Sequence, residues 1–202
     1  MPNWKTHLEI SRRLNEKYKF NDKDYELFLI GSILPDINNS YVVTDISKKI
    51  GHSVTHFWNQ EKPSYICFYN KYQQDIDEHN PIFVGYVTHL YTDYTWNNNF
   101  YTSVSKRNFI EKDKEKLRIL KQSDFKIYNN KFVDRHIELK NNLYEEVLER
   151  IKVISEVDII RKDLENVCEF LKENHKYIAK YQFYTEQELD ELLDKTIIGL
   201  LK

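Results

Sequence analysis

The chain has 202 residues, with 30 Lys and Arg against 32 Asp and Glu and a formal net charge of -2. This length favours one well-filled hydrophobic core. The balanced charge excludes a general electrostatic attraction to nucleic acid or to anionic membranes, so any anion binding must be local.

The sequence lacks the patterns of an exported or membrane-inserted chain. Its first 20 residues, MPNWKTHLEISRRLNEKYKF, carry charges throughout, and no later stretch is long and apolar enough to cross a bilayer. Cys67 and Cys168 lie far apart without metal-type spacing. We therefore expect a cytoplasmic protein with reduced thiols and no transmembrane segment. The oligomeric state is left open.

The N-terminal segment predicts an amphipathic helix that points a histidine inward. The residues that recur at helical spacing are Trp4, Leu8, Ser11, Leu14 and Tyr18. His7 falls on the same side of the helix, so we expect its imidazole to lie in or near the core.

The segment YELFLIGSILPDI, at 25–37, predicts a helix buried on most sides. Pro35 is expected to stop this helix, and Asp36 follows directly. Leu34 precedes the proline, which favours an extended backbone there. A carboxylate in these surroundings should be partly buried and should need a partner.

Two histidines follow in GHSVTHFW, at 51–58. His52 and His56 would share one face if this segment were helical, whereas either could act alone in a loop.

In GYVTHLYTDYTW, at 85–96, His89 and Asp93 lie one helical turn apart among aromatic residues. Gly85 and Asn97 fall on the same line of the helix. Gly85 costs a helix about 1 kcal/mol relative to alanine, so we expect another element or a ligand to approach the backbone there.

The second half of the chain should be mostly helical, because Gly199 is its only glycine and no proline follows Pro81. Three apolar stripes agree with this: Leu143, Val147 and Ile151; Ile160, Leu164, Val167 and Leu171; and Leu189, Leu192, Leu193 and Leu200. Start signals are Asn80 before Pro81 and a capping box of Thr185 with Glu188. We predict an all-α fold of seven or eight helices in one domain over 1–202, with a metal-binding half at about 1–100 and a helical covering half at about 101–202.

Two segments of the second half allow other interpretations. FKIYNNKFV, at 125–133, alternates around Asn129 and Asn130 and has a minority chance of being a short hairpin. The lysine-rich run 106–121 contains interleaved acidic residues, which favours a solvated helix face over a binding patch.

Each histidine or aspartate, taken alone, is most simply a hydrogen-bonded core or cap residue. Together, the residues that emerge from apolar surroundings favour a metal cluster: His7, Asp36, His56, His89 and Asp93. Imidazole and carboxylate suit zinc, and a cation offsets the desolvation of buried carboxylates.

The ordered set of His7, the PDI containing Asp36, the HF containing His56 and the GYxxHxxxD containing His89 and Asp93 resembles the zinc-dependent phospholipase C family and the related single-strand-specific zinc nucleases. The resemblance covers about residues 1–100. It implies an all-helical bundle with zinc ions at the bottom of a cleft and an activity that cleaves phosphoester bonds.

By this resemblance, Asp36, His56, His89 and Asp93 would surround one zinc ion, and Asp93 would bridge to a second ion held by His7. Asp36 would also act as the base for, or orient, the attacking water. The family uses the amine and carbonyl of an N-terminal tryptophan as ligands, whereas Trp4 is internal here.

The family's third zinc site needs a histidine about six residues after the HxxxD aspartate, where this chain has Asn97, Asn98 and Asn99. Two zinc ions are therefore expected, and the third site is doubtful. Candidates for additional metal or substrate contacts are His52, Asn97, Asp134 and His136, although a surface helix start is the favoured interpretation of Asp134 and His136.

The leading functional prediction is a metal-dependent phosphoester hydrolase, acting on a phosphate-containing small molecule or a lipid headgroup. Tyr86, Tyr94, Trp96 and Trp58 could stack on such a substrate, but most aromatic residues should fill the core. Two alternatives stay open: a non-catalytic helical domain with a structural metal site, and a nucleotide phosphohydrolase of other ancestry.

Overall fold

The computed structural model describes residues 3–59, 64–107, 109, 113–132, 137, 139, 141–173 and 176–202. These residues form eleven α-helices and one 3-10 helix, and they contain no β-strand. The elements are α1 (Trp4–Tyr18), α2 (Asp22–Gly31), α3 (Leu34–Ile37), α4 (His52–Thr55), α5 (Tyr65–Lys71), α6 (Gln73–Asp77), α7 (Pro81–Lys106), α8 (Lys114–Tyr128), η1 (Asn129–Lys131), α9 (Asn141–Ile151), α10 (Arg161–Lys172) and α11 (Glu186–Leu200). The all-α prediction is confirmed. The helix count exceeds the expected seven or eight because α3, α4 and α6 have only four or five residues each.

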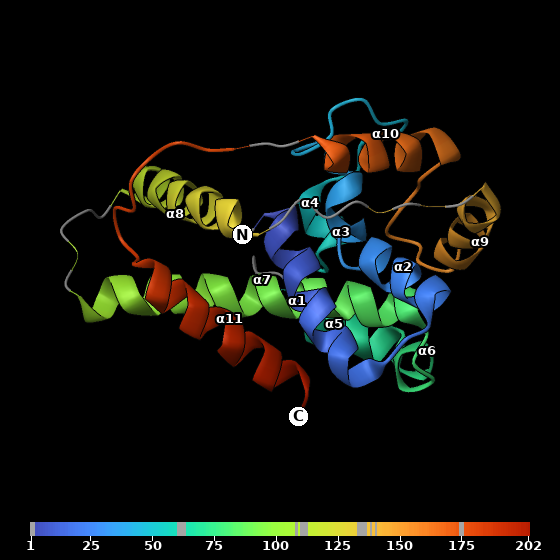
Figure 1. Cartoon of the computed structure of the whole chain (residues 1–202), viewed down its shortest axis with the longest axis horizontal. Coiled ribbons are helices and arrows are strands. Elements are labelled where there is room, and N and C mark those ends of the chain that lie inside the picture. The colour runs from blue at the N-terminus through green and yellow to red at the C-terminus, as the bar shows by residue number, and fades with distance from the viewer. Residues whose placement is uncertain are drawn as a thin grey trace.

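The longest helix, α7, runs along the long axis of the molecule (Figure 1). Its N-terminal part packs against α2, and α8 and α11 lie toward its C-terminal part, while α9 and α10 cover the other side of α2 and α3 (Figure 1). In the described part of the chain, no helix has the length and apolar character needed to span a bilayer.

Several helix ends follow the start signals in the sequence. Asn80 is the N-cap of α7 and Pro81 begins the helix. At α11 the Thr185 hydroxyl accepts from the backbone N–H of Glu188, and the Glu188 carboxylate accepts from the backbone N–H of Thr185. This reciprocal capping box confirms the prediction.

The hairpin that was a minority interpretation of 125–133 does not form in the described residues. Helix α8 continues to Tyr128 and passes into the 3-10 turn η1. Phe125 and Tyr128 are buried on one face of α8, at helical spacing. Asn129 is held by the Thr6 hydroxyl, which donates to its Oδ1 at 2.7 Å. Tertiary contacts therefore determine the secondary structure of this segment, whose alternation of apolar and polar residues allowed either a helix or a hairpin.

The three apolar stripes lie on α9, α10 and α11, and most of their members are buried. Ile160 is an exception, because it is the N-cap of α10 and is 49% exposed. Asp163, three residues later, is buried instead, and its carboxylate accepts from the backbone N–H of Ile160 at 2.9 Å. The carboxylate thus caps α10 and turns the first residue of the stripe outward.

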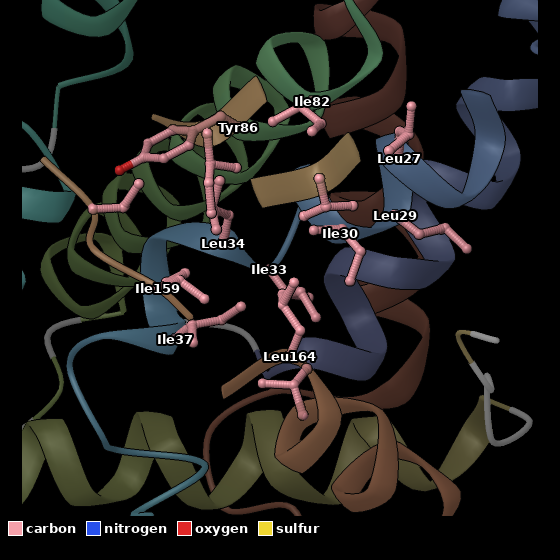
Figure 2. Close-up of a cluster of buried hydrophobic side chains, with 14 of the residues drawn as sticks. Leu27, Leu29, Ile30, Ile33, Leu34, Ile37, Ile82, Tyr86, Ile159 and Leu164 are labelled. Atoms are coloured by element: carbon pink, nitrogen blue, oxygen red, sulfur yellow. The ribbon is translucent and has the colours of Figure 1, made fainter. Parts of the chain in front are cut away.

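The hydrophobic core has two clusters. The first surrounds α2 and α3, whose side chains meet residues of α7, of α10 and of the segment just before α10 (Figure 2). The residues labelled in this view are Leu27, Leu29, Ile30, Ile33, Leu34, Ile37, Ile82, Tyr86, Ile159 and Leu164. The second joins α1 and α7 to α8 and α11, around residues such as Trp96, Phe100, Phe125 and Leu193. The two clusters hold α7 along most of its length.

Close contact between α2 and α7 depends on two glycines. A Cβ at Gly85 would lie 2.4 Å from the Phe28 carbonyl oxygen and 2.7 Å from the Ser32 nitrogen. A Cβ at Gly31 would lie 2.3 Å from the carbonyl oxygen of Ile82. The expected approach to Gly85 is therefore made by another helix, whose backbone touches that of α7.

Candidate metal centre

The contact between α2 and α7 orients His89. Helix α2 ends at Gly31, and the Ser32 carbonyl accepts from His89 Nδ1 at 2.8 Å. Because a carbonyl oxygen only accepts, Nδ1 carries a proton, and in the neutral ring the lone pair is on Nε2. A backbone carbonyl on one ring nitrogen is the usual outer partner of a metal-binding histidine.

The next residue after Gly85 positions a second histidine. Tyr86 is fully buried and its hydroxyl donates to the Thr55 carbonyl at 2.5 Å, at the end of α4. The Thr55 hydroxyl in turn contacts His56 Nδ1 at 3.0 Å. His56 Nε2 then lies 3.2 Å from His89 Nε2. The Gly-Tyr pair of the motif thus ties both α2 and α4 to α7.

His52 and His56 do share a face, since α4 is one helical turn. Their rings stack with centroids 3.5 Å apart and planes inclined by 13°. Burial, and then the neighbouring His56, lower the pKa of His52 to about 4. Ligand atoms of Asp36, His52 and His56 lie within 4.8 Å of one another.

Asp36 lies in α3 rather than immediately after a long helix. The prediction that Pro35 stops the helix is wrong, because α2 already ends at Gly31 and Pro35 falls in the first turn of α3. Leu34 is likewise helical and not extended. The Asp36 N–H donates to the Ile33 carbonyl at 3.0 Å, which closes this turn. A first-turn proline breaks no intrahelical hydrogen bond.

Two side chains hold the Asp36 carboxylate in a fixed orientation. The Asn39 amide donates to Oδ1 at 2.7 Å, and the Trp4 indole Nε1 donates to Oδ2 at 3.3 Å. Asp36 Oδ1 lies 3.5 Å from His56 Nε2, and Oδ2 lies 3.9 Å from His89 Nε2. Trp4 therefore reaches the site through its side chain.

His7 approaches from α1 and lies beside His89, near the Oδ1 atom of the Asp93 carboxylate. Its ring stacks on that of His89, with centroids 4.0 Å apart and planes inclined by 8°. His7 Nε2 lies 3.5 Å from Asp93 Oδ1. Asp93 Oδ2 instead lies 3.3 Å from His56 Nε2 and 3.5 Å from His89 Nε2. The two oxygens of one carboxylate thus face two different sets of imidazoles.

The cluster is buried, and part of its hydrogen-bonding capacity is unused. His7, His56, His89 and Asp93 are 0% exposed. Within the described part of the chain, no hydrogen bond reaches either ring nitrogen of His7 or either carboxylate oxygen of Asp93. Buried polar atoms without hydrogen-bond partners destabilise the fold, so this arrangement favours the binding of a cation among these atoms.

The electrostatics of the cluster favour ionised carboxylates. Burial alone would raise the pKa of Asp93, but His89, His56 and His7 outweigh it and hold this pKa well below its usual range. Burial also opposes ionisation of Asp36, yet the neighbouring imidazoles lower its pKa. Burial and the nearby His89 lower the pKa of His7 to about 4, so its ring is neutral at neutral pH. Ionised carboxylates and neutral imidazoles are the forms that bind metals.

The distances fit zinc. A tetrahedral zinc ion with bonds of about 2.0–2.1 Å holds neighbouring ligand atoms about 3.3 Å apart. The contacts of Asp93 with His7, His56 and His89 range from 3.3 to 3.5 Å. Ligand atoms of His7, His89 and Asp93 lie within 4.8 Å of one another. These buried groups could therefore bind metal.

The structure brings together all five residues predicted as metal ligands, His7, Asp36, His56, His89 and Asp93, from α1, α3, the end of α4 and α7. Of the candidates for additional contacts, His52 adjoins the cluster. Asn97 lies one turn further along α7 and accepts from Lys121. Asp134 and His136 lie outside the described residues.

Some residues that shape the site were missed by sequence reasoning. Ser32 acts on His89 through a tertiary contact that no local pattern marks. Asn39 contacts Asp36 three residues away and Thr55 contacts the adjacent His56, but such polar residues are too common to be singled out. Lys121 was assigned to a solvated helix face, whereas it is only 5% exposed. Its position four residues after Leu117 and one after Leu120, both buried, was an available signal for an inward direction.

A cleft of about 1560 Å³ opens beside the cluster. Its lining includes Asp36, His52, Asn97 and Lys121. Trp58 and Tyr94 also line it and are 45% and 41% exposed. Tyr86 and Trp96, by contrast, are fully buried, so they belong to the core. The cleft gives a solute access to Asp36 and His52.

The all-helical fold with buried histidines and aspartates beside a cleft defines a candidate metal-binding protein. The family model described as zinc dependent phospholipase C matches residues 6–201 of the chain. The chain therefore belongs to the zinc-dependent phospholipase C family, which implies a zinc-dependent hydrolase of this type. Comparison with curated proteins and with solved structures finds no match.

Proposed function

We propose that this protein hydrolyses phosphoester bonds with two zinc ions bound by the cluster. The observation that supports this most directly is the placement of Asp93, whose Oδ2 faces His56 and His89 while Oδ1 faces His7. A carboxylate with both oxygens directed at different imidazoles is suited to bridge two cations.

In this proposal one ion is held by Asp36, His56, His89 and Asp93. The other would be held by Asp93 and His7. His52 is a candidate additional ligand because its ring lies against His56 and its ligand atom is near Asp36. Asp93 is the shared ligand on which both ions depend.

The chain's own groups account for binding and proton transfer. Bound zinc lowers the pKa of water to about 7 and stabilises the negative charge that develops on phosphate oxygens. Two divalent ions with two carboxylates leave the site positive, which attracts phosphate although the whole chain is slightly acidic. Asp36 is ionised and faces the cleft, and Trp4 and Asn39 orient it, so it is placed to accept a proton from the attacking water.

The substrate is a phosphate-containing small molecule or a lipid headgroup. The cleft is large enough for either, and the exposed rings of Trp58 and Tyr94 provide apolar faces for a glycerol, acyl or base group. Phosphodiesters and phosphomonoesters both fit the proposed chemistry.

The test is hydrolysis by the zinc-loaded chain of a panel containing a chromogenic phosphodiester, a chromogenic phosphomonoester and phosphatidylcholine in mixed micelles. We expect turnover of at least one substrate, and a loss of about 100-fold or more in Asp36→Asn. His79→Asn is the matched control, because His79 is exposed with φ of 58°, a conformation that asparagine tolerates.

Zinc retention without turnover of any substrate would contradict the proposal. That result would favour the alternative of a structural metal site. The asparagines at 97–99 support the same alternative, because they occupy the place of the histidine expected for the family's third zinc site.

A further inference from the structure

Lys121 is a buried cation in the wall of the cleft. It lies in the middle of α8, whose other basic residues Lys114, Lys116, Arg118 and Lys126 are exposed. Lys121 is instead only 5% exposed and points toward α7. Burial of an ammonium group is costly unless a partner compensates it.

The contacts of Lys121 hold the ammonium in place without neutralising it. Nζ donates to Asn97 Oδ1 at 2.6 Å. It also lies 5.2 Å from the ring centre of Tyr101 and 5.6 Å from that of Phe100. Among the residues that the structure describes, no carboxylate forms an ion pair with Lys121. An ammonium has three donors, and Asn97 accepts only one of them.

Asn97 relates this ammonium to the metal centre. It follows Asp93 by one turn of α7, which is a rise of about 6 Å. Lys121, Asn97, Asp36 and His52 all line the same cleft. An anion bound in this cleft would therefore have Lys121 and the candidate metal ligands Asp36 and His52 in the walls around it.

The charge state agrees with a role in anion binding. Burial lowers the pKa of Lys121 to about 8, against an opposing effect of Asp93. Lys121 is therefore still mostly protonated at neutral pH.

We propose that Lys121, held by Asn97, binds a phosphate oxygen of the substrate next to the metal centre. The proposal rests on the proposed function for the identity of the anion. It assigns Lys121 to substrate binding rather than to metal binding, and Asn97 is its positioning residue. A lysine is suited to this task because it offers a point charge with several donors.

The test measures the dissociation constant of inorganic phosphate by isothermal titration calorimetry, using zinc-loaded protein freed of unbound zinc. We expect Lys121→Met and Lys121→Gln to weaken phosphate binding roughly 10- to 100-fold, the loss of one charged hydrogen bond. Their zinc content should equal that of the wild type. Lys121→Arg should retain part of the affinity because it retains the charge.

Lys126→Gln is the matched control. Lys126 lies on the same helix, lines the same cleft and carries the same charge, but it is exposed. We expect its phosphate affinity to stay within about twofold of the wild type. Wild-type phosphate affinity in Lys121→Met, or no phosphate binding by the wild-type chain, would overturn the proposal.

The two proposals fail separately. Hydrolysis of a phosphoester with an unchanged KM in Lys121→Met would remove the role of Lys121 and leave the proposed function intact. Loss of phosphate affinity in Lys121→Met, together with no turnover of any phosphoester by the wild type, would remove the proposed function and leave the role of Lys121 in phosphate binding.

Discussion

His89 shows how single atoms decide the chemistry of this site. Its Nδ1 is occupied by the Ser32 carbonyl, which directs the lone pair of Nε2 at Asp36 and Asp93. The carboxylates also affect its charge: burial lowers the pKa of His89, but Asp93 and Asp36 outweigh burial and raise it. A raised pKa means that the His89 ring binds a second proton more readily. A cation between these groups would replace this second proton, so metal binding should release protons.

Lys121 allows a prediction about stability and pH. Its pKa is lowered by burial to about 8 in the folded chain, so below this pH folding must bury a charged ammonium. Between pH 8 and the higher pKa of the unfolded chain, the folded state is neutral while the unfolded state still binds the proton. The penalty is therefore complete below pH 8 and decreases as the pH rises through that window.

Lys121→Met removes this penalty and fills a similar volume. The groups that set the pKa besides burial are Asp93 on α7 and Arg118 on α8, and both are unchanged in the variant. We expect the variant to be more stable at pH 7 by up to about 3 kcal/mol, or roughly 6–12 °C in Tm, and less so at pH 9.5. Thermal denaturation of both proteins at both pH values is the measurement. An equal difference at the two pH values would contradict the assigned cause.

The residue types of the site were predictable, whereas their outer partners were not. A histidine or aspartate in apolar surroundings is visible in sequence because its burial needs a reason, as for His7 and Asp93. The Asn39 amide and the Ser32 carbonyl carry no such signal, since polar residues and backbone carbonyls occur everywhere. Lys121 was concealed by the exposed basic residues around it.

At the scale of secondary structure, α7 organises the site. Its Gly85 admits α2, its Tyr86 holds the end of α4, and its His89 and Asp93 provide ligand atoms. The motif GYxxHxxxD thus combines packing and binding on one helix. Because these residues are one turn apart on a rigid helix, the packing residues fix the positions of the candidate ligands His89 and Asp93.

Gly85→Ala tests this packing. The new Cβ would meet backbone atoms of α2 at 2.4–2.8 Å, which cannot turn aside as a side chain could. The overpacking of about 1–3 kcal/mol should exceed the gain of about 1 kcal/mol in helix propensity, so Tm should fall. Displacement of Ser32 from His89 should also weaken zinc binding.

Gly51→Ala is the control for this substitution. Gly51 has φ of -62°, and a Cβ there would meet nothing closer than 3.9 Å. Its stability should change by less than about 1 kcal/mol. Denaturant titration and zinc content of both variants give the comparison, and a Gly85→Ala protein as stable as Gly51→Ala would refute the close-contact argument.

The long helices were predictable from periodicity and caps, but the short ones were not. Helix α11 begins at its capping box and α7 at its proline, as expected. The turn at α3 was mistaken for the end of a longer helix, because α2 already ends at Gly31, where the backbone of Ile82 lies close. Such contacts between elements distant in sequence are absent from any local window.

For the whole molecule, the main finding is convergence. Ligand atoms from positions 7 to 93 meet in one buried place, although the carboxylates and imidazoles would each be better hydrated in the unfolded chain. A metal that binds only the folded state would compensate this cost and stabilise the fold by mass action. The sequence predicted which residues would meet, while the distances and the cleft required the folded structure. The division of the chain into a metal-binding half and a covering half stays a prediction.

The most direct test is the zinc content per chain, by inductively coupled plasma mass spectrometry, of protein purified without added metal. We predict bound zinc in the wild type, essentially none in Asp93→Ala, and partial retention in His7→Ala, which removes a ligand of only one ion. Circular dichroism of the variants should show a folded helical protein. A wild-type zinc content in folded Asp93→Ala, or a wild-type chain that binds no zinc, would contradict the account.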